Sequence, residues 1–418
     1  MEKELEKAVL AGLNSDVLPY EDRSNEDSLD ELEALLETAG GVCVGKVLQN
    51  RATPDPRTFI GEGKVMEMRE IIEANHCTLA VFDNELSPSQ LRALSDDLGV
   101  RVLDRAALIL DIFAQRAKTR EGRLQVELAQ YKYILPRLTG MWTHLVRQTS
   151  SGSPIGTRGP GETQLETDRR HIRRKIDKLE EELEEVRKVR STQRRRRIKN
   201  GVPVVALVGY TNAGKSTLLN CLTDAGIPAV NRLFDTLDTT TRRLRISDTQ
   251  EILLSDTVGF ISKLPHHLVE AFKATLEELK FADILLHVID VSNPEWRKQA
   301  DVVEKLIVQL EAEQTPCIRV FNKCDLANLE FIPTGEDCVS ISAISGEGTD
   351  TLLKTIENIL DRGKKQVILH LPYAKAGLIE MLHKEGSVIR TDYCDNYIEI
   401  EVVLQPEAYG KVRDYIIE

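Results

Sequence analysis

The residues best suited to chemistry lie in one segment near the middle of the chain, Val204–Ser216. Its sequence, VVALVGYTNAGKS, is an apolar run that ends at Gly209, followed by Gly214, Lys215 and Ser216 at the start of an amphipathic segment. A strand, a glycine-bounded loop and a helix start form the GxxxxGK[ST] pattern of a phosphate-binding loop. Backbone N–H groups and the helix dipole would cradle phosphates, Lys215 would bridge the β- and γ-phosphates, and Ser216 would bind Mg²⁺.

Segments further along the chain would complete a nucleotide site. Asp256 of the DTVG segment would reach Mg²⁺ through water, and the amide of Gly259 would meet the γ-phosphate. Asp325 of the NKCD segment can accept hydrogen bonds from N1–H and the exocyclic amine of guanine, a donor pair that adenine lacks. Backbone N–H groups at Ser342-Ala343 could bind guanine O6. These segments together predict a protein that binds GTP and Mg²⁺.

A threonine in the loop Phe234–Asp238 is expected to complete the Mg²⁺ shell while the γ-phosphate is present. Thr236 is the preferred candidate because its flanking Phe and Leu could hold it in place. Thr239, Thr240 and Thr241 are alternatives, but they run into the following strand.

Composition limits the class of protein. The 418 residues are 41% hydrophobic and 29% charged, and the formal net charge of −12 argues against a general nucleic-acid binder. Seven scattered cysteines without a CxxC pair indicate reduced thiols rather than a disulfide framework or zinc site. The N-terminal segment lacks a signal-peptide pattern, and apolar runs such as Val202–Gly209 are too short to span a membrane. We expect a cytoplasmic monomer that does not insert into membranes or bind DNA.

The expected fold class is α/β. A P-loop GTPase domain (residues 199–363) is preceded by a small α/β domain (1–121) with a long antiparallel helical hairpin (122–198), and is followed by a small α+β domain (366–418). Residues 1–40 predict two short acidic helices around a polar loop at Tyr20–Ser28, and alternating strands and helices begin at Gly41. The last predicted helix is Pro406–Ile417.

The hairpin is predicted from two segments in which apolar residues recur every three or four positions. A glycine-rich loop between them, residues 149–163, would form the tip. The two apolar seams consist of Leu124, Leu128, Tyr131, Leu135 and Leu138, and of Ile172, Ile176, Leu179, Leu183 and Val186.

Four segments carry a resemblance to a known family: GPGETQLETDRR (residues 159–170), RLQVELAQYKYILPRLTG (123–140), GYTNAGKST (209–217) and DTVGFI (256–261). Together they resemble the HflX family of translation-factor-related GTPases. The resemblance covers most of the chain and is weakest over residues 1–40 and 366–418. Asp235 and Thr239 stand where that family frequently has alanine and proline, which affects the expected conformation of the loop around Thr236.

The resemblance implies that the residues matching Ser216 and Thr236 hold Mg²⁺. It also implies association with the large ribosomal subunit, through rRNA and protein, and in several members the splitting of stalled ribosomes. The predicted catalytic residues are Lys215, Thr236 and Gly259. The predicted nucleotide-binding residues are Gly209, Tyr210, Thr211, Asn212, Ala213, Gly214, Lys215, Ser216, Thr217, Phe234, Asp235, Thr236, Leu237, Asp238, Asp256, Thr257, Val258, Gly259, Asn322, Lys323, Cys324, Asp325, Ser342, Ala343 and Ile344.

Arg147 and Arg158, in or near the tip loop, could contact RNA phosphates from the end of a slender hairpin. The alternative is that basic runs on this hairpin are solvated helix faces and that the glycine loop is a connector. Two other functions stay open at this point: a GTP-timed accessory factor for RNA remodelling or modification, and a coiled-coil signalling scaffold.

Phe260 occupies the position after the DTVG glycine, where many relatives carry a glutamine that orients the attacking water. We therefore expect slow intrinsic hydrolysis with activation by a partner. Asn212 in the phosphate-binding loop has two interpretations: it binds a K⁺ ion that takes the place of an arginine finger, or it only stabilises the loop.

Overall fold

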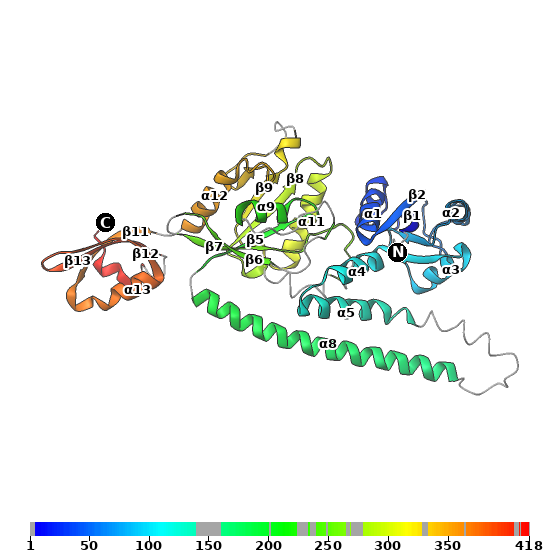
Figure 1. Cartoon of the computed structure of the whole chain (residues 1–418), viewed down its shortest axis with the longest axis horizontal. Helices are drawn as coiled ribbons and strands as arrows, with labels where there is room; N and C mark the ends of the chain where they lie inside the picture. The colour runs from blue at the N-terminus through cyan, green and yellow to red at the C-terminus, as the bar shows by residue number, and fades with distance from the viewer. Residues whose placement is uncertain are drawn as a thin grey trace.

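The computed structural model describes residues 5–138, 160–199, 202–223, 233–234, 240–247, 250–264, 268, 279–327, 333–362, 365–404, 409 and 411–417. These residues form three α/β or α+β domains and a helical hairpin (Figure 1). The N-terminal and C-terminal domains lie at opposite ends of the molecule, with the central domain between them (Figure 1). No helix of the described part of the chain is long and apolar enough to cross a membrane.

The N-terminal domain is a four-stranded parallel sheet with strand order β2-β1-β3-β4. Its strands are β1 (Glu6–Asn14), β2 (Gly41–Asn50), β3 (Leu79–Phe82) and β4 (Arg101–Asp104). The helices that connect or follow them are α1 (Glu26–Ala39), α2 (Glu62–Asn75), α3 (Pro88–Leu98) and α4 (Arg105–Arg116).

The prediction of two short helices within residues 1–40 was wrong for the first of them. The segment Ala8–Leu13 belongs to β1, an inner strand between β2 and β3, and its residues are fully buried. A strand buried on both faces shows a continuous apolar run without the alternation that identifies a half-exposed strand. The second helix does form, as α1, which begins at a capping box of Asn25 with Ser28 and ends at Gly40 in the left-handed conformation.

The hairpin consists of α5 (Arg120–Ile134) and α8 (Pro160–Lys199). The 40-residue α8 is about 60 Å long and runs alongside the N-terminal and central domains (Figure 1). Glu121, at the start of α5, pairs with Arg190, and Tyr131, near its end, accepts a hydrogen bond from Lys175, so the helices are antiparallel. Their apolar contact is made by predicted seam residues, namely Leu124, Leu128, Ile176, Leu179 and Leu183, with Tyr131, Leu135, Ile172 and Val186 at its margin.

The central domain has a six-stranded sheet with order β10-β9-β8-β5-β7-β6, in which β6 alone runs antiparallel to its neighbour. The strands are β5 (Val204–Gly209), β6 (Thr240–Arg245), β7 (Glu251–Asp256), β8 (Ile284–Asp290), β9 (Cys317–Asn322) and β10 (Cys338–Ser340). Helices α9 (Lys215–Thr223) and α12 (Thr349–Asp361) pack on one face of the sheet, and α11 (Trp296–Gln309) packs on the other.

The C-terminal domain contains an antiparallel three-stranded sheet of order β11-β13-β12 and the helix α13. Its elements are β11 (Lys365–Pro372), α13 (Gly377–Glu385), β12 (Gly386–Tyr393) and β13 (Tyr397–Leu404). The predicted helix Pro406–Ile417 falls partly outside the described residues, and a 3₁₀ turn covers Arg413–Tyr415.

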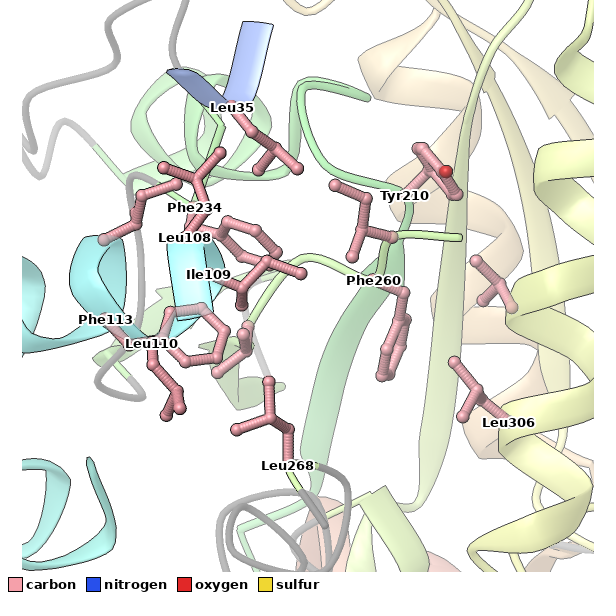
Figure 2. Close-up of a cluster of buried hydrophobic side chains, with 14 of the residues drawn as sticks. Leu35, Leu108, Ile109, Leu110, Phe113, Tyr210, Phe234, Phe260, Leu268 and Leu306 are labelled. Carbon is pink, nitrogen blue, oxygen red and sulfur yellow. The ribbon is translucent and has the colours of Figure 1, made fainter. Parts of the chain in front are cut away.

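The N-terminal and central domains share one apolar core, which the sequence did not predict. Leu35, Ile109 and Phe113 of the N-terminal domain belong to the same buried cluster as Phe234 and Phe260 of the central domain (Figure 2). The rings of Phe113 and Phe234 meet edge to face with centroids 4.7 Å apart. The segments that flank the predicted nucleotide site are therefore built into a domain interface.

Candidate active site

The loop between β5 and α9 has the backbone of a phosphate cradle. A Cβ on Gly209 would lie 2.3 Å from the Val288 carbonyl oxygen of β8, so only glycine allows this close approach. Gly214 adopts φ of +95°, and Asn212 adopts φ of +61°. These left-handed residues turn the chain so that α9 begins at Lys215 and its N-terminus faces the loop.

Lys215 lies inside this loop. Its Nζ donates to the carbonyl oxygens of Gly209 (3.0 Å) and Tyr210 (2.7 Å). Burial lowers the pKa of Lys215 to about 8, an effect that the Asp256 carboxylate partly opposes. A buried ammonium group at the N-terminus of a helix is suited to bind an anionic phosphate.

The predicted Mg²⁺ ligands at the end of β7 and the start of α9 are adjacent. Ser216 Oγ donates to Asp256 Oδ2 at 2.8 Å, and Asp256 is fully buried. A hydroxyl beside a carboxylate is a set of hard oxygen donors that fits Mg²⁺ coordinated in part through water and phosphate. Thr257, the next residue, anchors the segment by donating to the Leu207 carbonyl oxygen at 2.6 Å. Asp235, Thr236, Leu237 and Asp238 lie outside the described residues.

The DTVG segment is hydrogen-bonded to the phosphate loop. Phe260 N–H donates to Gly209 O (3.1 Å), and Thr211 N–H donates to Phe260 O (2.7 Å). A Cβ on Gly259 would lie 3.0 Å from the Thr211 side chain and 3.1 Å from Lys215 Nζ. Gly259 therefore sits where its backbone can reach the γ-phosphate that Lys215 would bind, and Val258 is buried beside it.

Asn322, at the end of β9, ties the loop after β10, one of the two predicted guanine-binding loops, to the predicted phosphate loop. Its Nδ2 donates to Ala213 O (2.8 Å), and its Oδ1 accepts from Ala343 N–H (3.0 Å). Lys323 pairs with Asp290 at 2.6 Å and is left-handed, with φ of +64°. This turn leads into the short 3₁₀ helix Cys324–Leu326, in which Asp325 is exposed to solvent.

The backbone amides of the loop after β10 are already engaged. Ser342 N–H donates to Glu347 O (3.0 Å), and Ala343 N–H donates to the Asn322 side chain. The prediction that these two amides donate to guanine O6 thus requires one of these bonds to change or to be shared. Ile344, the next residue, is exposed, as Asp325 is.

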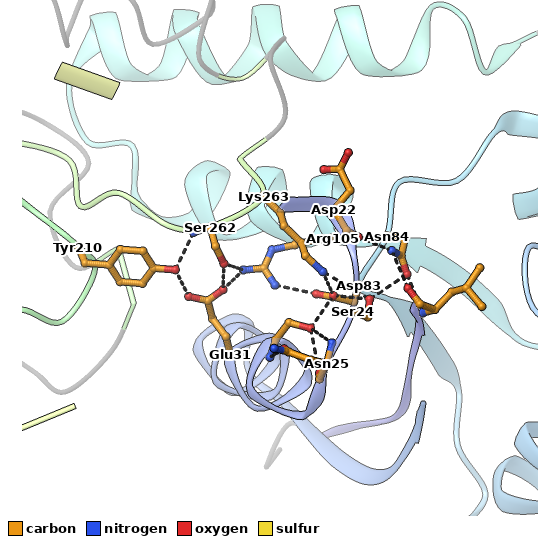
Figure 3. A network of polar contacts seen from close by, with 12 residues as sticks. Asp22, Ser24, Asn25, Glu31, Asp83, Asn84, Arg105, Tyr210, Ser262 and Lys263 are labelled. Atoms are coloured by element: carbon orange, nitrogen blue, oxygen red, sulfur yellow. Dashed lines mark hydrogen bonds and ion pairs between the residues drawn. The ribbon is translucent and has the colours of Figure 1, made fainter. Parts of the chain in front are cut away.

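A buried polar network joins the site to the N-terminal domain (Figure 3). The Tyr210 hydroxyl of the phosphate loop donates to Glu31 of α1 and accepts from Ser262 N–H at 2.7 Å. Glu31 also pairs with the fully buried Arg105. Burial, then the Glu31 charge, raises the pKa of Tyr210, so the phenol stays neutral and donates.

The same network continues to the end of β3. Asp83 accepts from Arg105 (2.8 Å) and from Ser24 (2.6 Å), and it pairs with Lys263. In a parallel sheet of order β2-β1-β3-β4, Asp83 stands at the carboxyl edge where the strand order reverses, the usual ligand position of such folds. Here the position is filled by Lys263, four residues after Gly259.

Sequence reasoning missed Glu31, Asp83 and Arg105. The available signal was the placement of Asp83 directly after the buried strand LAVF, and of Arg105 before the apolar run AALIL. Charges at such junctions suggest a buried pair, but they do not identify the partner segment.

Models of known families match three parts of the chain. Residues 26–114 match the N-terminal region of GTP-binding GTPases, residues 116–197 match their middle region, and residues 204–323 match the 50S ribosome-binding GTPase family. The last of these spans the phosphate loop, the DTVG segment and the first two residues of NKCD.

Similar curated proteins extend over nearly the whole chain. GTPase HflX of Caldanaerobacter subterraneus is 46% identical over 99% of this chain and 95% of its own length. GTPase HflX of Escherichia coli is 45% identical over 84% of this chain and 83% of its own length. Among solved structures, a GTP-binding protein from Sulfolobus solfataricus in complex with GDP is 23% identical, with a TM-score of 0.45, over 86% of this chain and 99% of that chain.

Proposed function

The chain belongs to the HflX family of GTPases, and we propose that it binds the large ribosomal subunit in its GTP-bound state and uses hydrolysis to time its release. Splitting or rescue of stalled ribosomes in the cytoplasm is the process that this timing would serve. The observation that carries the proposal is the match of residues 204–323 to the 50S ribosome-binding GTPase family, within a chain similar to HflX proteins over nearly its full length.

The proposed chemistry is in-line attack of water on the γ-phosphate, which gives GDP and phosphate. Lys215 and the Gly259 amide stabilise charge that develops on the γ-phosphate oxygens. Ser216 and Thr236 would hold Mg²⁺, with Asp256 acting through water, and the ion would supply positive charge against the phosphates. The closeness of Ser216, Asp256, Lys215 and Gly259 supports these roles.

Guanine selection is assigned to Asp325, and its test is direct. An Asp325→Asn variant is expected to lose its preference for GTP over xanthosine triphosphate, because the amide supplies a donor where the carboxylate only accepts. Nucleotide competition binding measures this preference. A variant that keeps full GTP preference would contradict the assignment.

The hairpin is proposed as the part that reaches the ribosome, with Arg147 and Arg158 contacting rRNA phosphates near its tip. Both arginines lie outside the described residues. The proposal is supported by the length of α8 and by exposed basic residues, Arg170, Arg173 and Arg174, on its tip-proximal half.

Co-sedimentation tests the ribosomal role. The protein bound to a non-hydrolysable GTP analogue is expected to migrate with the large subunit, and the GDP-bound protein is expected to migrate with it less. Deletion of Gly159–Gly161 should abolish co-migration while nucleotide affinity is kept. Arg187→Glu changes an exposed site on α8 far from the tip and serves as the control, which should still co-migrate. Failure of the wild-type protein to co-migrate would contradict the proposal, and binding to protein-free RNA alone would favour an RNA accessory factor.

Slow intrinsic turnover is proposed because Phe260 cannot orient the attacking water, and the ribosome is proposed as the activating partner. Asn212 is exposed in the phosphate loop, where its side chain could bind K⁺. GTP turnover measured in potassium and in sodium decides this point, since equal rates would exclude a K⁺ requirement.

A further inference from the structure

The Thr211 hydroxyl is buried without a hydrogen-bond partner. The residue is 6% exposed, and within the described part of the chain its Oγ1 has no donor or acceptor in range. Its backbone N–H is used separately, donating to Phe260 O. An unsatisfied buried hydroxyl is destabilising, and such groups in native proteins call for an explanation such as a bound ligand.

The position of Thr211 indicates that this ligand lies at the γ-phosphate end of the nucleotide site. Thr211 Cα and Cγ2 lie 3.0 Å from the point where a Gly259 Cβ would stand, and Lys215 Nζ lies 3.1 Å from the same point. Gly259 and Lys215 are the two groups that would bind the γ-phosphate. Thr211 therefore borders the γ-phosphate end of the site and not the guanine end, where Asn322 and Asp325 lie.

The neighbouring residue leaves this end without the usual water-orienting side chain. Phe260 follows Gly259 where a glutamine is common, and its side chain is buried among apolar residues of the domain interface (Figure 2). Its backbone is hydrogen-bonded to Gly209 and Thr211, which holds it in this place. A phenyl ring cannot donate to phosphate or accept from water.

We propose that Thr211 is a catalytic residue of GTP hydrolysis. Its O–H donates to a γ-phosphate oxygen, and its Oγ1 accepts a hydrogen bond from the attacking water, which is thereby held in line with the bond to be broken. The water oxygen bonds to the γ-phosphorus, the bond to the β-bridging oxygen breaks, and the water proton leaves on phosphate. Thr211 is not consumed. The inference rests on GTP hydrolysis at this site, and it is independent of the ribosomal role.

The test compares three substitutions in the full-length protein. Thr211→Val keeps the shape and removes the hydroxyl, and Thr211→Ser restores the hydroxyl. Thr223→Val is the control, because it removes a hydroxyl that donates to the Leu219 carbonyl oxygen at the end of α9. The readouts are single-turnover hydrolysis of bound GTP, the affinity for GDP, and the affinity of the GDP-bound protein for aluminium fluoride, which imitates the transferring phosphoryl group.

The expected result for Thr211→Val is hydrolysis slowed about 10- to 100-fold, as for loss of a hydrogen bond to a charged transition state. Aluminium fluoride affinity should fall in parallel, whereas GDP affinity should stay within about twofold. Thr211→Ser and Thr223→Val should hydrolyse GTP close to the wild-type rate.

Hydrolysis by Thr211→Val at the wild-type rate would overturn the inference. So would a loss of GDP affinity as large as the loss of rate, or a Thr211→Ser variant as slow as Thr211→Val, since both results would indicate a structural role. A wild-type protein that hydrolyses no GTP would overturn this inference and the GTPase assignment together.

Discussion

Lys263 should be essential to the interface between the N-terminal and central domains. Its side chain is 8% exposed and pairs with Asp83, which is fully buried. Burial lowers the pKa of Lys263, and the Asp83 charge opposes this effect. Burial alone would raise the pKa of Asp83, but the charges of Arg105 and Lys263 hold it below its ordinary value. Both groups are therefore expected to be charged near neutral pH, and each is expected to stabilise the charge of the other.

Replacing Lys263 with methionine keeps most of the length of the side chain and removes its charge. Breaking a buried ion pair by removing one partner costs about 3–5 kcal/mol. Asp83 still has Arg105 at 2.8 Å and two hydroxyl donors, so the lower end of this range, about 3 kcal/mol, is expected. Lys305→Met is the matched control because Lys305 also bridges the two domains, to Glu21, but its side chain is 64% exposed. Solvent and salt screen such a pair, so no measurable loss of stability is expected.

Urea unfolding followed by circular dichroism measures both variants. With a dependence of about 1–3 kcal/mol per molar urea, a loss of about 3 kcal/mol lowers the first unfolding midpoint by at least about 1 M. The Lys305→Met midpoint should coincide with that of the wild type. An unchanged midpoint for Lys263→Met, or equal shifts for the two variants, would refute the conclusion that the buried network holds the domains together.

Three further outcomes are expected. The pKa of Lys215 is near 8 and phosphate favours the charged amine, so GTP binding should take up close to one proton at pH 9 and almost none at pH 7. Calorimetry in buffers of different ionisation enthalpy measures this uptake, and Lys215→Met should remove it. Gly214→Ala should weaken GDP binding by more than about tenfold because the Cβ would lie 2.2 Å from Asn322 Nδ2 at φ of +95°, whereas Gly63→Ala, which meets nothing within 4 Å, should not. Burial lowers the pKa of His287 to about 4, so as pH falls below about 6.5 the unfolded chain is protonated at His287 before the folded chain is. The free energy of unfolding should therefore decline from about pH 6.5 to about pH 4. The urea midpoint should decline less steeply over this range in His287→Leu.

The elements around the nucleotide were predictable because each motif follows its own strand. The ends of β5, β7 and β9 carry Gly209, Asp256 and Asn322, and in a parallel sheet these ends meet at one edge. The seams of the hairpin were equally clear, since a helix pair needs only one periodic stripe on each partner. Local sequence is sufficient where the partners are set by a regular geometry.

The domain interface could not be predicted for the opposite reason. Glu31 and Lys263 look like solvated charges of an ordinary helix and loop, and the position of Arg105 suggests a buried pair without identifying its partners. The strand β1 was missed because burial on both faces removes the periodicity that distinguishes a strand from a helix. In both cases the decisive information is tertiary.

The interface places a constraint on the nucleotide site itself. The segment from Gly259 to Lys263 joins the phosphate loop to the N-terminal domain. Phe260 and Ser262 are hydrogen-bonded to the phosphate loop, and Ser262 and Lys263 also contact Glu31 and Asp83 of the N-terminal domain. A five-residue stretch cannot move at Gly259 by more than a small amount without straining or breaking the contacts of Lys263. Any rearrangement near the γ-phosphate must then either carry the N-terminal domain with it or pay the cost of the buried pair, about 3 kcal/mol. The same free energy that Lys263→Met measures is therefore the upper limit on how strongly this pair alone can couple the nucleotide site to the N-terminal domain.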